Sequence, residues 1–189
     1  TTPQLISRFR NALNINSRKE ASNIIEICRN DMRLDALNLL FMEAQMYSHF
    51  CEWDKIIGME NFSSLCYTRK PLEITAILLE SIYQVHFSHI KEEKGLEEQS
   101  KLWGGDIRKT ARQILQTPIP KCVTRGGLIL YVLELCELRD LEETNNQSEL
   151  LQAIKDQSQE VDDFSFFLSE LESFEEKPLR IKIDDDQQK

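Results

Sequence analysis

Hydrophobic residues recur along most of this 189-residue chain at the spacing of an α-helix. In the first segment, Leu5, Phe9 and Leu13 fall on one stripe. Two later segments, 72–90 and 128–141, are apolar around much of the helical circumference, which is typical of helices in the middle of a bundle or stack. The pattern predicts an all-α fold of about eight to nine helices, arranged as an irregular helical bundle or a short α-solenoid.

Local signals place several helix ends. Ser17 and Glu20 have the spacing of a capping box, which predicts that a helix starts directly after Ser17. Pro71 suits the first turn of the next long helix, and Pro118 and Pro120 end an amphipathic one. The charged, glycine-containing segment 91–100 is interpreted as a frayed helix end or a connector.

These elements are assigned to one all-α domain over residues 1–175, with a possible subdivision near 91–104. Residues 160–189 hold four bases and ten acids, so −6 of the net charge of −9 lies there. We therefore expect residues 176–189 to be an acidic tail, disordered or a short extended segment. The chain begins Thr1-Thr2-Pro3, and we expect it to be a segment or subunit of a larger intracellular assembly.

Composition narrows the class of protein. Hydrophobic residues make up 41% of the chain, and six glycines and five prolines are too few for a collagen-like or disordered protein. Five cysteines, an odd number without a C-x-x-C pair, indicate reduced thiols. The longest apolar run, 126–133, ends at Glu134, well short of the roughly 20 residues that span a bilayer. We expect a cytoplasmic protein that does not enter a membrane.

One stretch resembles a known repeat. The large, small and aromatic positions of Leu40, Ala44, Tyr47, Trp53 and Ile56 resemble half of a tetratricopeptide repeat. The resemblance implies closely packed helical hairpins over residues 17–90. Glu43 stands where that repeat usually has leucine, and no second copy follows about 34 residues later.

No sequence pattern nominates an active site. His86 and His89 could share a helix face, but with Glu92 and Glu93 they form only a loose H-x-x-H-x-x-E pattern, and a surface position explains them as well. The chain lacks a Walker loop, a G-x-S-x-G elbow and an H-E-x-x-H motif. We therefore predict no catalytic activity, no cofactor and no metal.

A basic segment offers one possible binding site. Between residues 101 and 125 there are six bases and a single acid, Asp106, a local excess of +5. If the proline-containing turn brings Lys121 and Arg125 beside the preceding helix, four or five cations converge, enough to bind a phosphate backbone or a phosphorylated ligand. Alternatively, the basic face is solvated or paired with acids. The candidate residues are Arg108, Lys109, Arg112, Lys121 and Arg125.

An aromatic helix near the C-terminus offers a second possible binding site. Four of the nine phenylalanines lie within 162–174, and one of them falls off the main hydrophobic stripe. A protein partner that binds this helix in a groove would cover all four rings, and so would packing inside the domain itself. The candidates are Phe164, Phe166, Phe167 and Phe174. The function predicted first is a non-catalytic scaffold or adaptor domain that binds protein through helix faces; contact with nucleic acid or a phosphate ligand is the alternative.

Overall fold

The computed structural model of the protein describes residues 1–31, 33–90, 95–116, 118–140 and 147–161, with positions 164, 167 and 169. Ten α-helices and no β-strand lie in these ranges, which confirms the predicted all-α class. None of these helices is long and apolar enough to span a membrane. The helices are α1 (Thr2–Asn14), α2 (Arg18–Asn30), α3 (Ala36–His49), α4 (Trp53–Ile57), α5 (Phe62–Tyr67), α6 (Leu72–His86), α7 (Gly95–Leu102), α8 (Gly105–Arg112), α9 (Arg125–Asp140) and α10 (Gln147–Ser158).

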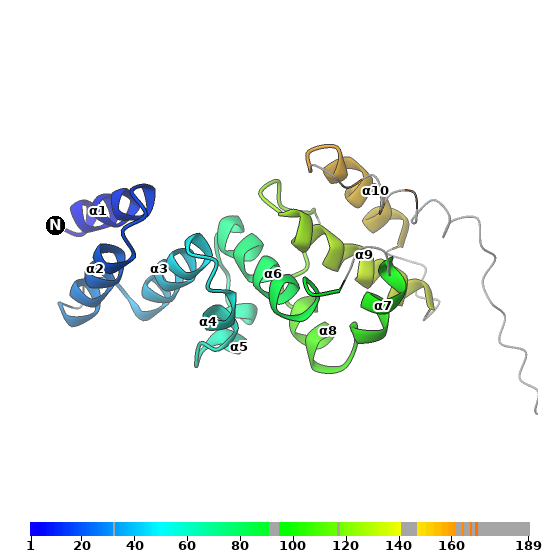
Figure 1. The fold of residues 1–189 in the computed structure, drawn as a ribbon, viewed down its shortest axis with the longest axis horizontal. Helices are drawn as coiled ribbons and strands as arrows, with labels where there is room; N and C mark the ends of the chain where they lie inside the picture. The colour runs from blue at the N-terminus through cyan, green and yellow to red at the C-terminus, as the bar shows by residue number, and fades with distance from the viewer. Residues whose placement is uncertain are drawn as a thin grey trace, which may run out of the picture.

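The helices follow one another along the longest axis of the molecule (Figure 1). At the N-terminal end α1 packs on α2 and α2 on α3, and α3 then packs on both α4 and α6. At the other end α9 is the central helix, in contact with α6, α7 and α10. Helix packing therefore follows chain order from α1 to α4, and beyond α4 it centres on the contact of α6 with α9.

Two hydrophobic clusters stabilise this arrangement. The smaller one joins α1, α2 and α3 around Phe9, Ile24 and Met46. The larger one extends from α4 to Phe167 and includes nearly every side chain of α9 from Leu128 to Leu133. Tyr47 of α3 packs against both clusters, so α3 connects the two halves of the molecule.

The helices α6 and α9 cross closely because of two glycines at the start of α9. A Cβ atom at Gly126 would lie 2.3 Å from Cδ1 of Tyr83, well inside van der Waals contact, and one at Gly127 would lie 3.4 Å from Cβ of Leu79. These helices correspond to the two segments predicted to be apolar on most sides, and the central position expected for them is confirmed.

Three details differ from the sequence-based expectation. Helix α6 ends at His86 rather than near residue 90, and α7 lies where a connector was expected. Helix α7 has too few hydrophobic residues to show a helical period in the sequence. Leu96 within the helix and Trp103, which directly follows it, are nevertheless buried. Helix α2 begins at Arg18 as predicted, yet Ser17 makes no side-chain capping bond. The expected tail, 176–189, lies outside the described residues.

Candidate functional site

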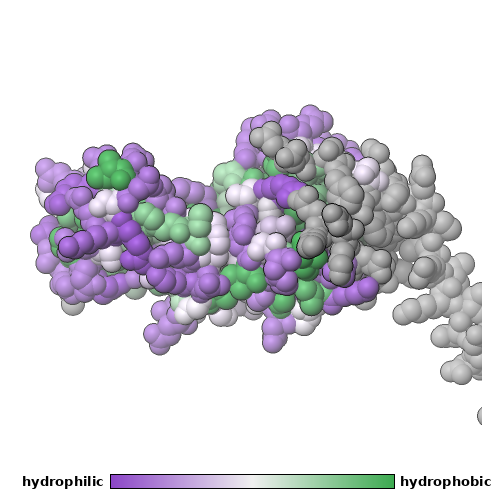
Figure 2. Space-filling view, viewed as in Figure 1, coloured by the Kyte–Doolittle hydropathy of each residue, from purple (hydrophilic) through white to green (hydrophobic). Residues whose placement is uncertain are grey.

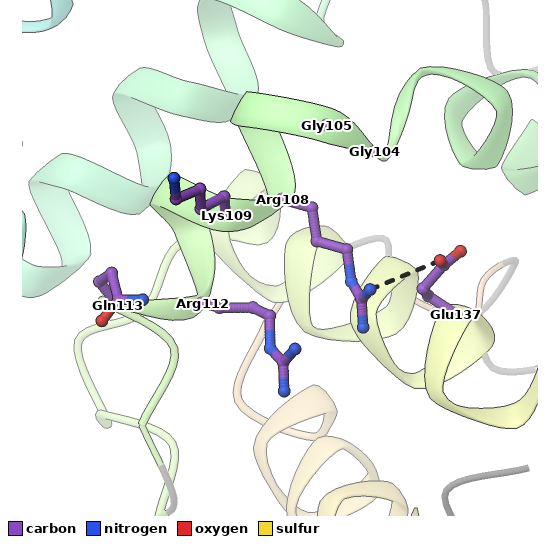
Figure 3. A pocket seen from close by; sticks show the side chains of 7 residues that line it. All are labelled: Gly104, Gly105, Arg108, Lys109, Arg112, Gln113 and Glu137. Carbon is purple, nitrogen blue, oxygen red and sulfur yellow. Dashed lines mark hydrogen bonds and ion pairs between the residues drawn. The ribbon is translucent and has the colours of Figure 1, made fainter. Parts of the chain in front are cut away.

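The main concave surface of interest lies on α8. It is a hollow of about 480 Å³ lined by Gly104, Gly105, Arg108, Lys109, Arg112, Gln113 and Glu137, and we call it the α8 hollow (Figure 3). Helix α8 supplies most of this lining because its turns present Arg108 and Arg112 four residues apart, on the same face. The structure thus brings together three of the five predicted cationic residues.

A buried carboxylate on α9, Glu134, holds the arginine side chains of this hollow. Glu134 is buried and accepts two hydrogen bonds from Arg108, from Nε to Oε2 at 2.9 Å and from Nη2 to Oε1 at 3.1 Å. The buried indole of Trp103 donates its Nε1–H to Oε2 of the same carboxylate at 3.2 Å. A bidentate guanidinium is the strongest common partner for a carboxylate, so this network fixes α8 against α9.

The outer arginine of α8 is held less completely. Nε of Arg112 lies 3.2 Å from Oε1 of Glu134, and 49% of the Arg112 side chain is exposed. Nη1 of Arg108 also reaches Oε1 of Glu137, at 3.5 Å. In Figure 3 the guanidinium groups of Arg108 and Arg112 extend to the same side of α8, while Lys109 and Gln113 extend to the other. The hollow therefore combines a fixed cation, a more exposed one and a lysine at its edge.

A second hollow begins at Arg112 and continues toward α10. It has a volume of about 360 Å³, and we call it the α10 hollow. Arg112 and Glu134 line it together with Leu115, Tyr131, Leu138, Glu149 and Leu150. The hydroxyl of Tyr131 accepts from N–H of Gln116 at 3.0 Å and donates to its carbonyl at 3.1 Å. Burial raises the pKa of Tyr131 to about 12, so this phenol has a structural role at neutral pH.

The other two predicted cations lie elsewhere. Lys121 and Arg125 line neither hollow. The segment that precedes α9 lies at the opposite side of the molecule from α8 in Figure 1, and the guanidinium of Arg125 lies 5.5 Å from the ring centroid of Phe167. The predicted convergence of all five cations therefore does not occur, because the turn after α8 directs the chain away from α8.

The start of α9 has a carboxylate of the protein beside it. Glu80 of α6 accepts a hydrogen bond from the hydroxyl of Thr124, and Thr124 accepts one from N–H of Gly127 at 3.1 Å. A Cβ atom at Gly126 would lie 2.6 Å from Oε2 of Glu80. The favourable potential at this helix N-terminus thus acts on a carboxylate of the protein itself.

The aromatic candidates divide into two groups. Phe164 and Phe167 are buried, each 2% exposed, and their rings stack with centroids 5.3 Å apart. They belong to the larger core, so neither ring is presented to a partner in this structure. Phe166 and Phe174 lie outside the described residues, and their predicted partner contact stays a prediction.

The histidine pair shows no metal site among described residues. His86 is partly buried and His89 is exposed. Burial, followed by the proximity of His89, lowers the pKa of His86 and so favours its neutral form. No group of three or more His, Cys, Asp or Glu side chains suited to a metal occurs within the described ranges, and Glu92 and Glu93 lie outside them.

Fold and site together define an all-helical protein with a charged hollow built on a buried arginine–glutamate network. The chain belongs to the DpdD-like family, whose model matches residues 1–177. No curated protein matches the chain, and no solved structure does.

The resemblance of residues 17–90 to tetratricopeptide repeats was wrong. The matching family covers this whole stretch and is not a tetratricopeptide family. The pattern of large, small and aromatic positions is not specific to that repeat, because a small residue between large ones suits any close contact between helices. Ala44 of α3, for example, is completely buried without belonging to a repeat.

Proposed function

We propose that this chain is a non-catalytic interaction domain, a scaffold or adaptor that binds another protein through helix faces within a cytoplasmic assembly. The observation that carries the proposal is the arrangement of the helices along one axis, with α1, α2 and α3 packed in succession at one end (Figure 1). Helices spread along one axis leave their sides exposed over a long surface, as in solenoid proteins that bind partners. Fold alone does not define function, so the chemistry of the hollows is the second support.

The hollows lack the groups that covalent catalysis needs. A nucleophile must lie beside a base that is itself oriented by a third group. The residues that line the α8 and α10 hollows include no serine, threonine, cysteine or histidine. Lys109 is exposed, whereas nucleophilic lysines are desolvated, and the hydroxyl of Tyr131 is bonded to Gln116. This composition favours recognition over turnover.

Exposed hydrophobic side chains do not by themselves define a binding patch. Figure 2 shows a largely hydrophilic face with separate hydrophobic areas. Among described residues, the large apolar side chains that are 47–68% exposed are Ile15, Tyr67, Leu72 and Leu102. Scattered residues of this kind are normal on protein surfaces. A partner site is therefore better sought where charge and shape coincide.

Contact with nucleic acid or a phosphate ligand is the second candidate, supported by the three cations of α8. Against it, Glu134 and Glu137 oppose these cations, Lys121 and Arg125 lie apart from them, and the chain carries a net charge of −9. A titration with single-stranded oligonucleotide across salt concentrations tests it. Lack of binding at low salt removes this candidate, because phosphate contacts are strongest there.

Crosslinking in the native host tests the main proposal. The tagged protein is treated in cells with an amine-reactive crosslinker and analysed by mass spectrometry. We expect one partner polypeptide crosslinked reproducibly to lysines on several helices, including Lys19, Lys55 and Lys109, and co-purified without crosslinking. Absence of any partner above a tag-only control, or turnover of a small molecule by the purified chain, would refute the proposal.

A further inference from the structure

We propose that the α8 and α10 hollows form one docking surface for an acidic segment of a partner protein, in which a carboxylate binds Arg112 and a neighbouring aliphatic side chain lies against Leu115. The inference rests on the proposed protein-binding function and deepens it by naming the surface and the chemistry of the partner. Three features of the hollows carry it: the availability of Arg112, the charge balance and the adjoining apolar wall.

Arg112 has donors available for a ligand. Its Nε lies 3.2 Å from Oε1 of Glu134, and its Nη atoms make no hydrogen bond with any described residue. The guanidinium lies beside that of Arg108, on the side away from Glu137 (Figure 3), and about half of the side chain is exposed. The ion pair of Nε with Glu134 leaves the Nη side of the guanidinium open to a ligand. A carboxylate that accepts from Nη1 and Nη2 would form a bidentate pair, as Arg108 forms through Nε and Nη2 with Glu134.

The charge balance of the hollow suits a carboxylate better than a nucleic acid. The α8 hollow is lined by Arg108, Lys109 and Arg112, which contribute +3, and by Glu137, which contributes −1, so its sum is +2. Glu134 and Glu149 line the α10 hollow, so the positive charge lies at the α8 end of the surface. A carboxylate at Arg112 lowers this local excess. A nucleic-acid strand needs a run of cations that follows its regularly spaced phosphates, and Lys121 and Arg125 do not extend the hollow in that way.

The neighbouring wall supplies an apolar contact. Arg112 lines both hollows, so a ligand that lies across it reaches the α10 hollow as well. There Leu115 is partly buried at the side, with Leu138 and Leu150 more deeply buried behind. An aliphatic residue next to the acidic one would cover this wall, whereas Glu149 at its edge disfavours a second acidic residue at that point. The expected ligand is an acidic residue followed closely by leucine, isoleucine or valine.

Peptide display on the full chain tests this inference. A library of random short peptides is selected on the immobilised wild-type protein and, in parallel, on Arg112→Gln and Lys109→Gln. The matched controls are Arg10→Gln and Lys19→Gln, which remove the same two residue types from exposed positions of α1 and α2 at the far end of the molecule. Circular dichroism and thermal unfolding verify that each variant is folded.

We expect the wild type to enrich peptides with an acidic residue beside an aliphatic one. For the best peptide, fluorescence polarisation should show affinity lowered about tenfold or more by Arg112→Gln, because a charge-assisted bidentate pair is lost. Lys109→Gln, at the edge, should lower it about threefold, and the controls should change it by less than about twofold. If Arg112→Gln unfolds the chain, the affinity of Lys109→Gln for the best peptide tests the inference on its own.

Contrary results are distinguishable. Failure to enrich any peptide, enrichment of basic peptides, or affinity unchanged by both α8 variants overturns the inference. Tight binding to single-stranded DNA that depends on Arg112 also overturns it and favours the nucleic-acid alternative. The broader protein-binding function fails only if the crosslinking experiment also finds no partner; a partner crosslinked to other helices would leave that function intact while removing this surface.

Discussion

The close crossing of α6 and α9 makes Gly126→Ala a sharp test of the packing described above. A methyl group at this position would lie 2.3 Å and 2.7 Å from Cδ1 and Cγ of Tyr83 and 2.6 Å from Oε2 of Glu80. The tyrosine atoms belong to the base of the ring, which moves only if the whole side chain moves. Glu80 is held by Thr124 and by Nε2 of Gln84, at 2.6 Å from Oε1. The crossing must therefore open.

Overpacking of this kind typically costs about 1–3 kcal/mol, and the three contacts place Gly126→Ala in the upper half of that range. For a chain of this length, a loss of about 2–3 kcal/mol in the free energy of unfolding lowers the melting temperature by roughly 5–10 °C. Urea unfolding followed by circular dichroism at 222 nm measures the first quantity, and a thermal scan measures the second.

Gly104→Ala is the matched control. A methyl group at Gly104 meets nothing within 4 Å, and its φ of −172° is extended backbone that alanine also adopts. We expect its free energy of unfolding to stay within about 0.5 kcal/mol of the wild type. If Gly126→Ala is equally neutral, the α6–α9 contact is not the close crossing described here.

Further predictions concern buried polar groups and thiols. Glu134→Gln removes the bidentate partner of the nearly buried Arg108 and should lower the free energy of unfolding, measured in urea, by about 3 kcal/mol or more. Glu137 is partly exposed and accepts from Arg108 at 3.5 Å, so Glu137→Gln should lower it by less than about 1 kcal/mol. Equal losses in the two variants would contradict the network. Tyr131→Phe should cost about 1–2 kcal/mol through its bonds to Gln116. Because the pKa of Tyr131 is raised from 10.0 to about 12, its stabilising contribution is complete below pH 10 and is lost as pH rises toward 12; this loss should be absent in Tyr131→Phe when stability is measured against pH. A thiol reagent should label the exposed Cys51 and Cys122 quickly in the native protein and Cys28, Cys66 and Cys136 only on unfolding; burial raises the pKa of Cys66 to about 11, which slows it further. Rapid labelling of all five would refute the burial pattern.

The all-α class was predictable because hydrophobic periodicity is local. The apolar character of α6 and α9 around most of their circumference identified the two central helices before any contact was known. The short helices α5 and α7 were not predicted, because α5 spans only six residues and α7 has only two hydrophobic residues, Leu96 and Leu102, which are too few to show a helical period. Resemblance at five positions was too little to identify the family.

The candidate site was only partly predictable, because its key partners are distant in sequence. A cluster of cations is visible near Arg108, but Glu134 lies 26 residues further on and reaches α8 only through the packing of α9. Glu80, whose carboxylate lies at the start of α9, is 44 residues from Thr124. Phe164 and Phe167 show the same limit: composition marked them as unusual, and only the fold placed them in the core.

The division of the interior into two clusters has a mechanical consequence. The layer of α1, α2 and α3 has its own core and meets the rest of the protein through one side of α3, which includes Tyr47, and through the ion pair of Arg18 with Glu52. Such a layer behaves as a separate cooperative unit, which opens without disrupting the interior around α9. Amide protons of α1 and α2 should therefore exchange with solvent through a sub-global opening, while those of α9 exchange only when the whole chain unfolds.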